Sequence, residues 1–252
     1  PTLAAYALER GISAIMVTGS HIPPDYNGLK FYRPDGELLK SDEEPIKTAA
    51  RALSQAVPDF DPFEPAHDPT ARQVYAARYT DAFSPDALSG LKIAVFEHST
   101  VGRDILLEVL EALGASCTSV GRSEVFVAVD TEAVEPSAMA QIHEALEAGQ
   151  FDAVVSMDGD GDRPLLVDAG GVQVNGDILG ALTARFLAAR AVVTPLTSTS
   201  ALEKSAWFET ISRTRIGSPY VVEEMARLDT DRIVGFEANG GLLTASPFRP
   251  AG

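Results

Sequence analysis

The sequence has little cysteine, little positive charge and no long hydrophobic run. Its single cysteine, Cys117, excludes an internal disulfide and cannot build a zinc site alone, which favours a reducing compartment. No run of about 18 apolar residues occurs, and the amino end lacks the basic segment and cleavage site of a signal peptide. We therefore expect a cytoplasmic protein without a membrane partner.

The charge balance excludes another class of partner. The 252 residues include 36 acidic and 20 basic side chains, so the net charge is -16. This is the wrong sign for a surface that neutralises nucleic-acid phosphates, and we expect no nucleic-acid partner. A small phosphorylated substrate can still bind an acidic protein where a few Lys, Arg and metal charges converge in one cleft.

The hydrophobic pattern predicts an α/β fold. Apolar residues make up 45% of the chain, enough for real cores in two or three domains. Apolar β-branched runs alternate with stretches of helical period, which is typical of α/β layers. The pattern predicts helices over residues 3–10, 70–83, 103–113, 136–148, 177–188, 199–206 and 218–228. It predicts strands over residues 13–17, 92–96, 115–120, 151–157, 164–168, 191–194, 209–213 and 232–236.

The same pattern predicts three units. Residues 58–69 carry four prolines and no period, so we expect a connection across the surface, with a domain boundary near Ser89. In each unit a glycine-rich polar loop follows the carboxyl end of a strand that we expect to be buried, the place where open α/β sheets bind ligands. The predicted units are residues 1–89, 90–189 and 190–252.

The sharpest chemical signal is the loop Asp158-Gly-Asp160-Gly-Asp162-Arg163. Alternate residues of an extended segment project the same way and the glycines let the backbone curl, so three carboxylates converge. Such hard oxygen ligands suit Mg²⁺. An EF-hand calcium loop would need Gly and Glu where this chain has Arg163 and Ala169, which excludes that interpretation. The alternative is a solvated acidic turn, but crowded acids repel each other unless a cation is present.

A second loop runs from Thr18 to Lys30 and places Ser20 at the exit of a strand, beside His21. A hydroxyl there can act as a nucleophile if His21, Lys30 and a nearby metal divide the tasks of base and charge stabilisation. The hydrolase motif G-x-S-x-G is absent, which leaves acyl transfer without support. Taken alone, Ser20 is more often a turn or cap residue, and it is the acidic loop that favours a nucleophile.

Two further loops carry groups suited to a sugar or a phosphate. Glu237 and Asn239 can hydrogen-bond sugar hydroxyls, although their loop also has the composition of an ordinary turn. Arg215 and Gly217 can present a guanidinium and a helix amino terminus to a phosphate. The alternative for this second loop is a helix cap by Ser218 with solvated arginines.

The remaining polar groups are assigned to structure rather than chemistry. The Ser99–Gly102 loop and the Thr197–Ser200 cluster are interpreted as helix caps. No partner can be identified for His67, His98 and His143.

Together, the motifs TGSHIPPDYNGLK, DGDGDR and FEANGG, in this order, resemble those of the α-D-phosphohexomutase superfamily, in particular its bacterial phosphomannomutases and phosphoglucomutases. The resemblance covers nearly the whole chain. It implies tandem three-layer α/β/α domains with mixed sheets around a central cleft. It also implies that the chain starts within the first domain and lacks a fourth, phosphate-binding domain.

The resemblance implies a role for each loop. Ser20 would be the phosphoserine, with His21 beside it, Lys30 as a candidate general base and Arg163 near the reacting groups. The implied Mg²⁺ ligands are Ser20, Asp158, Asp160 and Asp162. The implied substrate-binding residues are Glu237, Asn239, Gly217 and Arg215. The chain departs from the family motifs at Gly19, Ile22, Ser218, Asn239 and Gly241, which leaves the choice of hexose and the second acid/base residue open.

The implied activity is the interconversion of a hexose 6-phosphate and a hexose 1-phosphate, with mannose ahead of glucose as the sugar. A hexose 1,6-bisphosphate would be both intermediate and activator, and the protein would be a monomer or a homodimer. An alternative of a different class is a truncated, non-catalytic fragment that binds sugar phosphates. A metal-dependent phosphatase is disfavoured, because the acidic loop lacks the context of an aspartyl nucleophile and a phosphate kept from water suits transfer.

Overall fold

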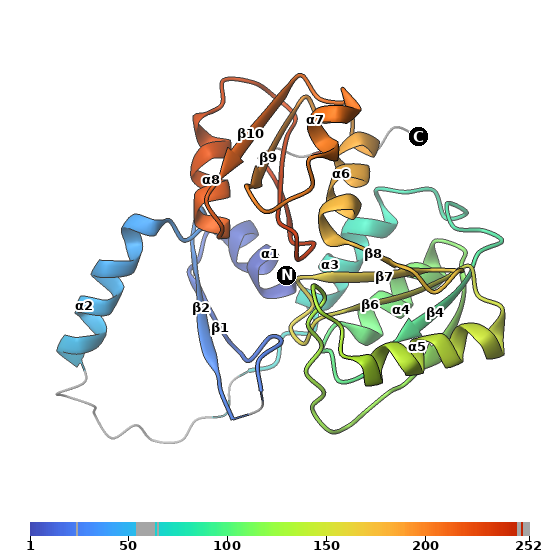
Figure 1. Cartoon of the computed structure of the whole chain (residues 1–252). Helices are drawn as coiled ribbons and strands as arrows, with labels where there is room; N and C mark the ends of the chain where they lie inside the picture. The colour runs from blue at the N-terminus through green and yellow to red at the C-terminus, as the bar shows by residue number, and fades with distance from the viewer. Residues whose placement is uncertain (24, 54–63, 65, 246–247, 249–252) are drawn as a thin grey trace.

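Three sheets organise the part of the chain that the structure describes. Figure 1 shows this structure, a computed structural model that describes residues 1–252 except 24, 54–63, 65, 246–247 and 249–252. The sheets contain three, five and four strands and follow one another in sequence. Among the described residues, no helix has both the length and the apolar character needed to cross a membrane.

The first unit is a small antiparallel sheet with one helix against it. Strands β1 and β2 form a hairpin that pairs Val17 with Leu29, and α1 packs against both strands. The prediction of a buried first strand was wrong, because Ile15 and Val17 of β1 are 55% and 68% exposed on the face away from α1. The elements are α1 (Thr2–Arg10), β1 (Ala14–Thr18), β2 (Gly28–Arg33), β3 (Gly36–Glu37), the 3-10 helix η1 (Lys40–Asp42) and α2 (Glu43–Leu53).

Helix α2 stands apart from the cores of the other units. Figure 1 shows it at the left edge of the molecule, and none of its residues is buried. Helix α3 (Thr70–Thr80), by contrast, packs against α1 and also against α4 (Arg103–Ala112). Its Ala76 joins Val109 and Leu113 in a small apolar cluster. The first and second units are therefore held together by helix packing as well as by the chain.

The second unit is a mixed five-stranded sheet between helices. The strand order is β5-β4-β6-β7-β8, with β4 parallel to β5 and β6, and the remaining pairs antiparallel. Ala94 and Phe96 of β4 pack with Ile142 of α5, while the alternate residues of β4 face the side where α4 packs. These elements are β4 (Lys92–Phe96), α4, β5 (Ser116–Val120), α5 (Pro136–Gly149), β6 (Ala153–Met157), β7 (Pro164–Asp168) and β8 (Gln173–Val174).

The third unit repeats this layering on a four-stranded sheet of order β10-β9-β11-β12. Val192 of β9 packs on the side of Ala184 in α6, and Val193 packs on the opposite side against Val221 in α8. The period of two in the strand therefore supplies two separate apolar faces. The elements are α6 (Gly176–Phe186), β9 (Ala191–Pro195), α7 (Ala201–Ser205), β10 (Thr210–Thr214), α8 (Ser218–Arg227), β11 (Ile233–Phe236) and β12 (Leu242–Thr244). Helix α6 packs on this sheet although it lies within residues 90–189, the range predicted for the second unit.

The predicted α/β class with tandem α/β/α domains and mixed sheets is confirmed. All helices and strands predicted from the hydrophobic pattern are present, with small displacements of their ends. The pattern did not predict β2, β3, η1, α2, β8 and β12. Of these, β3, η1, β8 and β12 have only two or three residues, and α2 has no buried residue. Most of the predicted surface connection over residues 58–69 lies outside the described residues.

Candidate active site

Ser20 lies against the acidic loop, although most of the first and second units separates the two in sequence. Its Oγ donates a hydrogen bond to Asp158 Oδ2 over 2.6 Å. Thr18, the last residue of β1, accepts the Ser20 amide hydrogen at 2.8 Å. The backbone of Ser20 has a φ of 48°, a left-handed conformation that is uncommon for residues other than glycine. The end of strand β1 therefore presents the hydroxyl directly to the predicted metal ligands.

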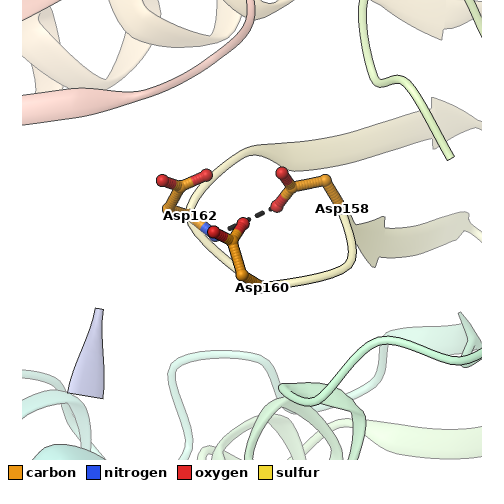
Figure 2. A group of neighbouring side chains, drawn as sticks. All are labelled: Asp158, Asp160 and Asp162. Atoms are coloured by element: carbon orange, nitrogen blue, oxygen red, sulfur yellow. Dashed lines mark hydrogen bonds between the residues drawn. The ribbon is translucent and has the colours of Figure 1, made fainter. Parts of the chain in front are cut away.

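The acidic loop connects the antiparallel strands β6 and β7. Figure 2 shows the three carboxylates of Asp158, Asp160 and Asp162 turned toward one another, and their ligand oxygens lie within 4.8 Å. Asp158 and Asp160 are buried, whereas Asp162 is exposed. Asp158 Oδ1 accepts the amide hydrogens of Gly161, Asp162 and Arg163 over 3.1–3.2 Å. These bonds fix the first carboxylate and leave its other oxygen to Ser20.

Lys30 brings a positive charge into this group of carboxylates. It extends from β2, and its Nζ lies 2.6 Å from Asp160 Oδ2 and 2.7 Å from Asp162 Oδ2. Thr18 Oγ1 also donates to Asp160 Oδ2, over 3.1 Å. The hairpin of the first unit thus contributes the Ser20 hydroxyl, the Lys30 ammonium group and the Thr18 hydroxyl to one site.

Burial and charge shift the pKa values of these groups in opposite directions. Burial raises the pKa of Asp158, and the neighbouring carboxylates raise it further. Burial acts the same way on Asp160, but the hydrogen bond and charge of Lys30 outweigh it and lower the pKa of Asp160. Burial alone would lower the pKa of Lys30, yet the two carboxylates raise it. In this arrangement Lys30 holds its proton, so a role as general base requires its release from both aspartates.

The donor set fits a small, hard cation. Asp160 Oδ1 is buried and has no hydrogen-bond partner among the described residues, which leaves a costly unsatisfied acceptor. It lies in a group whose other ligands are carboxylate oxygens and a serine hydroxyl, the oxygen donors that Mg²⁺ prefers. Ser20, Asp158, Asp160 and Asp162 are the side chains that would hold the ion.

His21 and Arg163 meet beside Ser20. Arg163 Nη1 lies 3.0 Å from His21 Nδ1, and Ser20 Oγ lies 3.3 Å from the same nitrogen. Because a guanidinium can only donate, His21 Nδ1 is the acceptor and its ring proton belongs on Nε2. The four predicted catalytic residues, Ser20, His21, Lys30 and Arg163, are all brought together with the acidic loop.

The predicted sugar-binding residues form a neighbouring loop. Glu237 Oε1 accepts the Gly217 amide hydrogen at 3.1 Å, so the two loops that we singled out in the third unit meet. Gly240 approaches Pro164, the residue after Arg163, so closely that an added Cβ would lie 2.9 Å from the proline ring. Asn239 Oδ1 accepts the Gly241 amide hydrogen at 2.8 Å. The structure therefore places this loop next to the acidic loop.

Arg215 contacts an aromatic ring rather than the acidic loop. Its guanidinium lies over the ring of Tyr220, 5.7 Å from the ring centroid. Across the described part of the chain, no hydrogen bond or ion pair joins Arg215 or Glu237 to the acidic loop.

The alternative of a cap by Ser218 is wrong, because helix α8 begins at Ser218 and its N-cap residue is Gly217, without a side-chain cap bond.

Three polar residues that support the site carry no signal in the sequence. Thr18 holds both Ser20 and Asp160, and Thr100 Oγ1 donates to the main-chain oxygen of Asp158 over 2.6 Å. His98, for which no partner was identified, lies with its Nε2 2.8 Å from the Met157 oxygen. The partners His98 and Thr100 could be found only from the strand order, which places the loop after β4 beside the loop after β6.

Both predicted caps lie at the start of a helix, although neither N-cap side chain makes a cap bond itself. The N-cap residue of α4 is Gly102, within the predicted Ser99–Gly102 loop, and Thr100 Oγ1 accepts its amide hydrogen at 3.3 Å. The second interpretation is confirmed in outline, because Ser200 is the N-cap residue of α7 and Thr199 Oγ1 accepts the Ala201 amide hydrogen.

Comparison with known proteins identifies relatives of this chain. Models of the family described as phosphoglucomutase/phosphomannomutase match it for domain I over residues 1–56, domain II over 73–171 and domain III over 175–249. A phosphomannomutase of Sinorhizobium fredii is 44% identical over 98% of this chain and 53% of its own length. A phosphomannomutase of Salmonella muenchen is 43% identical over 98% of this chain and 51% of its own length. The chain thus spans about half the length of these relatives.

Solved structures show the same fold. A putative phosphomannomutase from Thermus thermophilus superposes with a TM-score of 0.74 at 22% identity, covering 97% of this chain and 58% of the other. N-acetylphosphoglucosamine mutase of Aspergillus fumigatus, in complex with GlcNAc-6P and magnesium, gives a TM-score of 0.57 at 17% identity, covering 96% and 63%. With the matching domain models and relatives, these findings establish that the chain belongs to the α-D-phosphohexomutase superfamily.

Proposed function

We propose that this chain carries the phosphoryl-transfer centre of a hexose-phosphate mutase, with Ser20 as the residue that is phosphorylated. The observation that supports the proposal is the 2.6 Å contact between Ser20 Oγ and Asp158 Oδ2, inside a group of three carboxylates. A serine that only terminated a turn would not need a buried acidic loop against its hydroxyl. The phosphomannomutase relatives support the same reaction class.

The proposed reaction has two balanced phosphoryl transfers. In the first, the bond between phosphorus and Ser20 Oγ breaks as a bond forms to the free hydroxyl oxygen of a hexose monophosphate, whose proton passes to a base. The resulting hexose 1,6-bisphosphate reorients, and the bond between its other phosphorus and the sugar oxygen breaks as a bond forms to the free Ser20 oxygen. The sugar oxygen takes up a proton from the protonated base and becomes the free hydroxyl of the product. Each cycle therefore regenerates the phosphoserine and moves the substrate phosphate between positions 1 and 6.

The residues of the site divide the work of these transfers. Mg²⁺, when bound, would neutralise charge on the transferring phosphoryl group. Arg163 contacts His21, which in turn lies beside Ser20. Its guanidinium therefore adds a positive charge on the Ser20 side of the site. Lys30 bridges Asp160 and Asp162 in this structure and becomes available to substrate oxygen only when it leaves them.

The sugar would lie between the acidic loop and the Glu237–Asn239 loop. The approach of Gly240 to Pro164 brings these two loops together, and Glu237 has a second carboxylate oxygen that can accept from sugar hydroxyls. Mannose is the first choice because both relatives described above are named phosphomannomutase. Glucose is the second, as the domain models describe both activities.

Phosphorylation of the isolated chain tests the proposal directly. The purified protein is incubated with Mg²⁺ and either mannose 1,6-bisphosphate or glucose 1,6-bisphosphate, and its intact mass is measured. We expect one phosphoryl group on the wild type, mapped to Ser20 by peptide sequencing, and none on Ser20→Ala. Ser84→Ala removes an exposed serine outside the site and should be phosphorylated like the wild type.

The same experiment distinguishes the proposed mutase from the alternative, a fragment that binds sugar phosphates without catalysis. A chain that binds hexose phosphates in calorimetry but never acquires phosphate would be a binding module, and the mutase proposal would fail. Turnover of mannose 1-phosphate against glucose 1-phosphate, started from the phosphorylated protein, then identifies the preferred hexose.

A further inference from the structure

The loop between β4 and α4 lies directly against the acidic loop. Strands β4 and β6 are adjacent and parallel, so their carboxyl ends meet at the same edge of the sheet. The paired residues end at Val95 and Val155, where the chain after β4 turns away toward helix α4. Beyond this point, main-chain groups of the acidic loop need partners other than a neighbouring strand.

Residues 98–101 supply these partners one after another. His98 Nε2 donates to the Met157 oxygen over 2.8 Å, and Thr100 Oγ1 donates to the Asp158 oxygen over 2.6 Å. The Val101 amide donates to the next carbonyl, that of Gly159, over 3.1 Å. Three successive carbonyl groups at the start of the acidic loop are therefore bound by one segment.

Thr100 is the central member of this series. It is 1% exposed, and its hydroxyl also accepts the Gly102 amide hydrogen at 3.3 Å, so it acts as both donor and acceptor. The carbonyl that it binds belongs to Asp158, the residue whose side chain contacts Ser20. Holding that peptide group fixes the direction in which the Asp158 carboxylate leaves the backbone.

We propose that Thr100 is a positioning residue for the metal-binding loop. By orienting the Asp158 peptide group it keeps Asp158 Oδ1 under the amide hydrogens of residues 161–163 and Asp158 Oδ2 toward Ser20. His98 supports the same loop one residue earlier. The inference rests on the metal site of the proposed function, but it requires no phosphoryl transfer, so the two can fail separately.

Binding of Mn²⁺ as a probe of the Mg²⁺ site tests this role. Electron paramagnetic resonance measures free Mn²⁺ during titration of the wild type and of Thr100→Val, which keeps the shape of the side chain but removes the hydroxyl. Loss of a group that hydrogen-bonds to a metal ligand commonly weakens metal affinity by about 10–100-fold. We expect a loss of at least about 10-fold for Thr100→Val, and recovery of most of it in Thr100→Ser, which restores the donor.

A matched variant in the third unit separates positioning from general destabilisation. Thr194 is also a fully buried threonine, and its hydroxyl is hydrogen-bonded to Ser198 Oγ at 2.6 Å, far along the chain from the acidic loop. Thr194→Val should lower the melting temperature by an amount similar to Thr100→Val and leave the Mn²⁺ affinity unchanged. If Thr100→Val does not fold, Thr100→Cys, with its weak donor, takes its place.

The possible results are distinct. Unchanged Mn²⁺ affinity in the folded Thr100 variant would overturn the proposal, and so would an equal loss of affinity in Thr194→Val. Weak Mn²⁺ binding by Thr100→Val, with recovery in Thr100→Ser, would support it even if Ser20 were never phosphorylated.

Discussion

The acidic loop and the loop from Glu237 to Gly241, called the sugar loop after the role proposed for it, occupy equivalent places in successive units. Their polar groups are satisfied in different ways. Each follows the carboxyl end of a strand at the centre of a mixed sheet. In the sugar loop, Asn239 closes its own turn by accepting from Gly241, and Glu237 accepts from Gly217. In the acidic loop, two buried carboxylates lie side by side, and one oxygen of Asp160 has no partner among the described residues.

From this difference we expect that a cation stabilises the acidic loop, whereas the sugar loop is complete without one. Like charges at short distance in a buried place raise the free energy of the folded state unless a positive charge is supplied. Lys30 supplies part of it from the first unit. The sugar loop has one acidic side chain, hydrogen-bonded to a main-chain amide, and therefore should not respond to metal ions.

The largest effect is expected from a methyl group placed between the acidic loop and Ser20. In Gly159→Ala the new Cβ would lie 2.3 Å from the Ser20 carbonyl oxygen, so the two loops must separate. We expect a loss of about 1–3 kcal/mol in the free energy of unfolding together with loss of Mn²⁺ binding. Urea unfolding and Mn²⁺ titration measure both quantities.

The matched change in the sugar loop is Gly241→Ala. There the nearest atom to the new Cβ is the Asn239 side-chain oxygen at 3.1 Å, which can shift. We expect normal Mn²⁺ binding and a smaller loss of stability. Equal effects of the two substitutions would contradict the distinction between the loops.

A second prediction concerns the positive charge from the first unit. Lys30→Met leaves the carboxylates of Asp160 and Asp162 without their ammonium partner, at a cost of about 1–2 kcal/mol after allowance for partial exposure of the pair. Mg²⁺ should restore much of this stability, because an ion that binds the folded state stabilises it. Thermal unfolding with EDTA and with excess Mg²⁺ measures the effect.

A Lys30→Met protein as stable as the wild type in EDTA would contradict the distinction between the two loops. A control on a similar pair at the surface is Arg190→Met, which removes the partner of Glu209 and Asp231 in the third unit. Its stability should be insensitive to Mg²⁺.

A third prediction uses the pH dependence of the segment that supports the acidic loop. Burial lowers the pKa of His98 from its ordinary value of 6.5, and the charge of Arg103 acts in the same direction. Below pH 6.5 the unfolded chain binds a proton that the folded chain does not, so this residue reduces stability as the pH falls. When the pH falls from 7.5 to 5.5, the free energy of unfolding of the wild type should decrease by up to about 1 kcal/mol more than that of His98→Gln.

Urea unfolding at both pH values measures that difference. Glutamine keeps an amide donor near the position of His98 Nε2 and does not titrate, so the variant isolates the protonation effect. If His98→Gln showed the same pH dependence as the wild type, the loss of stability at low pH would come from groups other than His98.

The smallest effect is expected in the sugar loop itself. Glu237→Gln keeps an oxygen that can accept the Gly217 amide hydrogen, so the free energy of unfolding should change by less than about 1 kcal/mol. Mg²⁺ should stabilise the variant and the wild type equally, as measured by the shift in melting temperature. A clear change in the response to Mg²⁺ would show that Glu237 belongs to the metal site.

The parts of the fold that were predictable are those with a local signal. Buried strands such as 92–96 and helices such as 136–149 carry a clear hydrophobic period. The acidic loop could be recognised because its carboxylates are close in sequence. The contact between Ser20 and Asp158 was also expected, through the family resemblance.

The remainder depends on the arrangement of elements in space. Apolar residues occur on both faces of β1, and the sequence does not show that α1 covers one face and leaves Ile15 and Val17 exposed. The roles of His98 and Thr100 depend on the adjacency of β4 and β6, which a single sequence does not reveal. Lys30 was predicted as a base from its place in the motif, and its ion pairs became evident only from the geometry.

The hydrogen bond between Ser20 and Asp158 also has a consequence for folding. The two residues are 138 positions apart, so the second unit can form its own sheet before the hairpin of the first unit arrives. Closing so long a loop is slow and costs chain entropy that local contacts do not recover. High-affinity metal binding should therefore appear late in refolding, after the sheets, and would report the docking of the two units rather than the formation of either one.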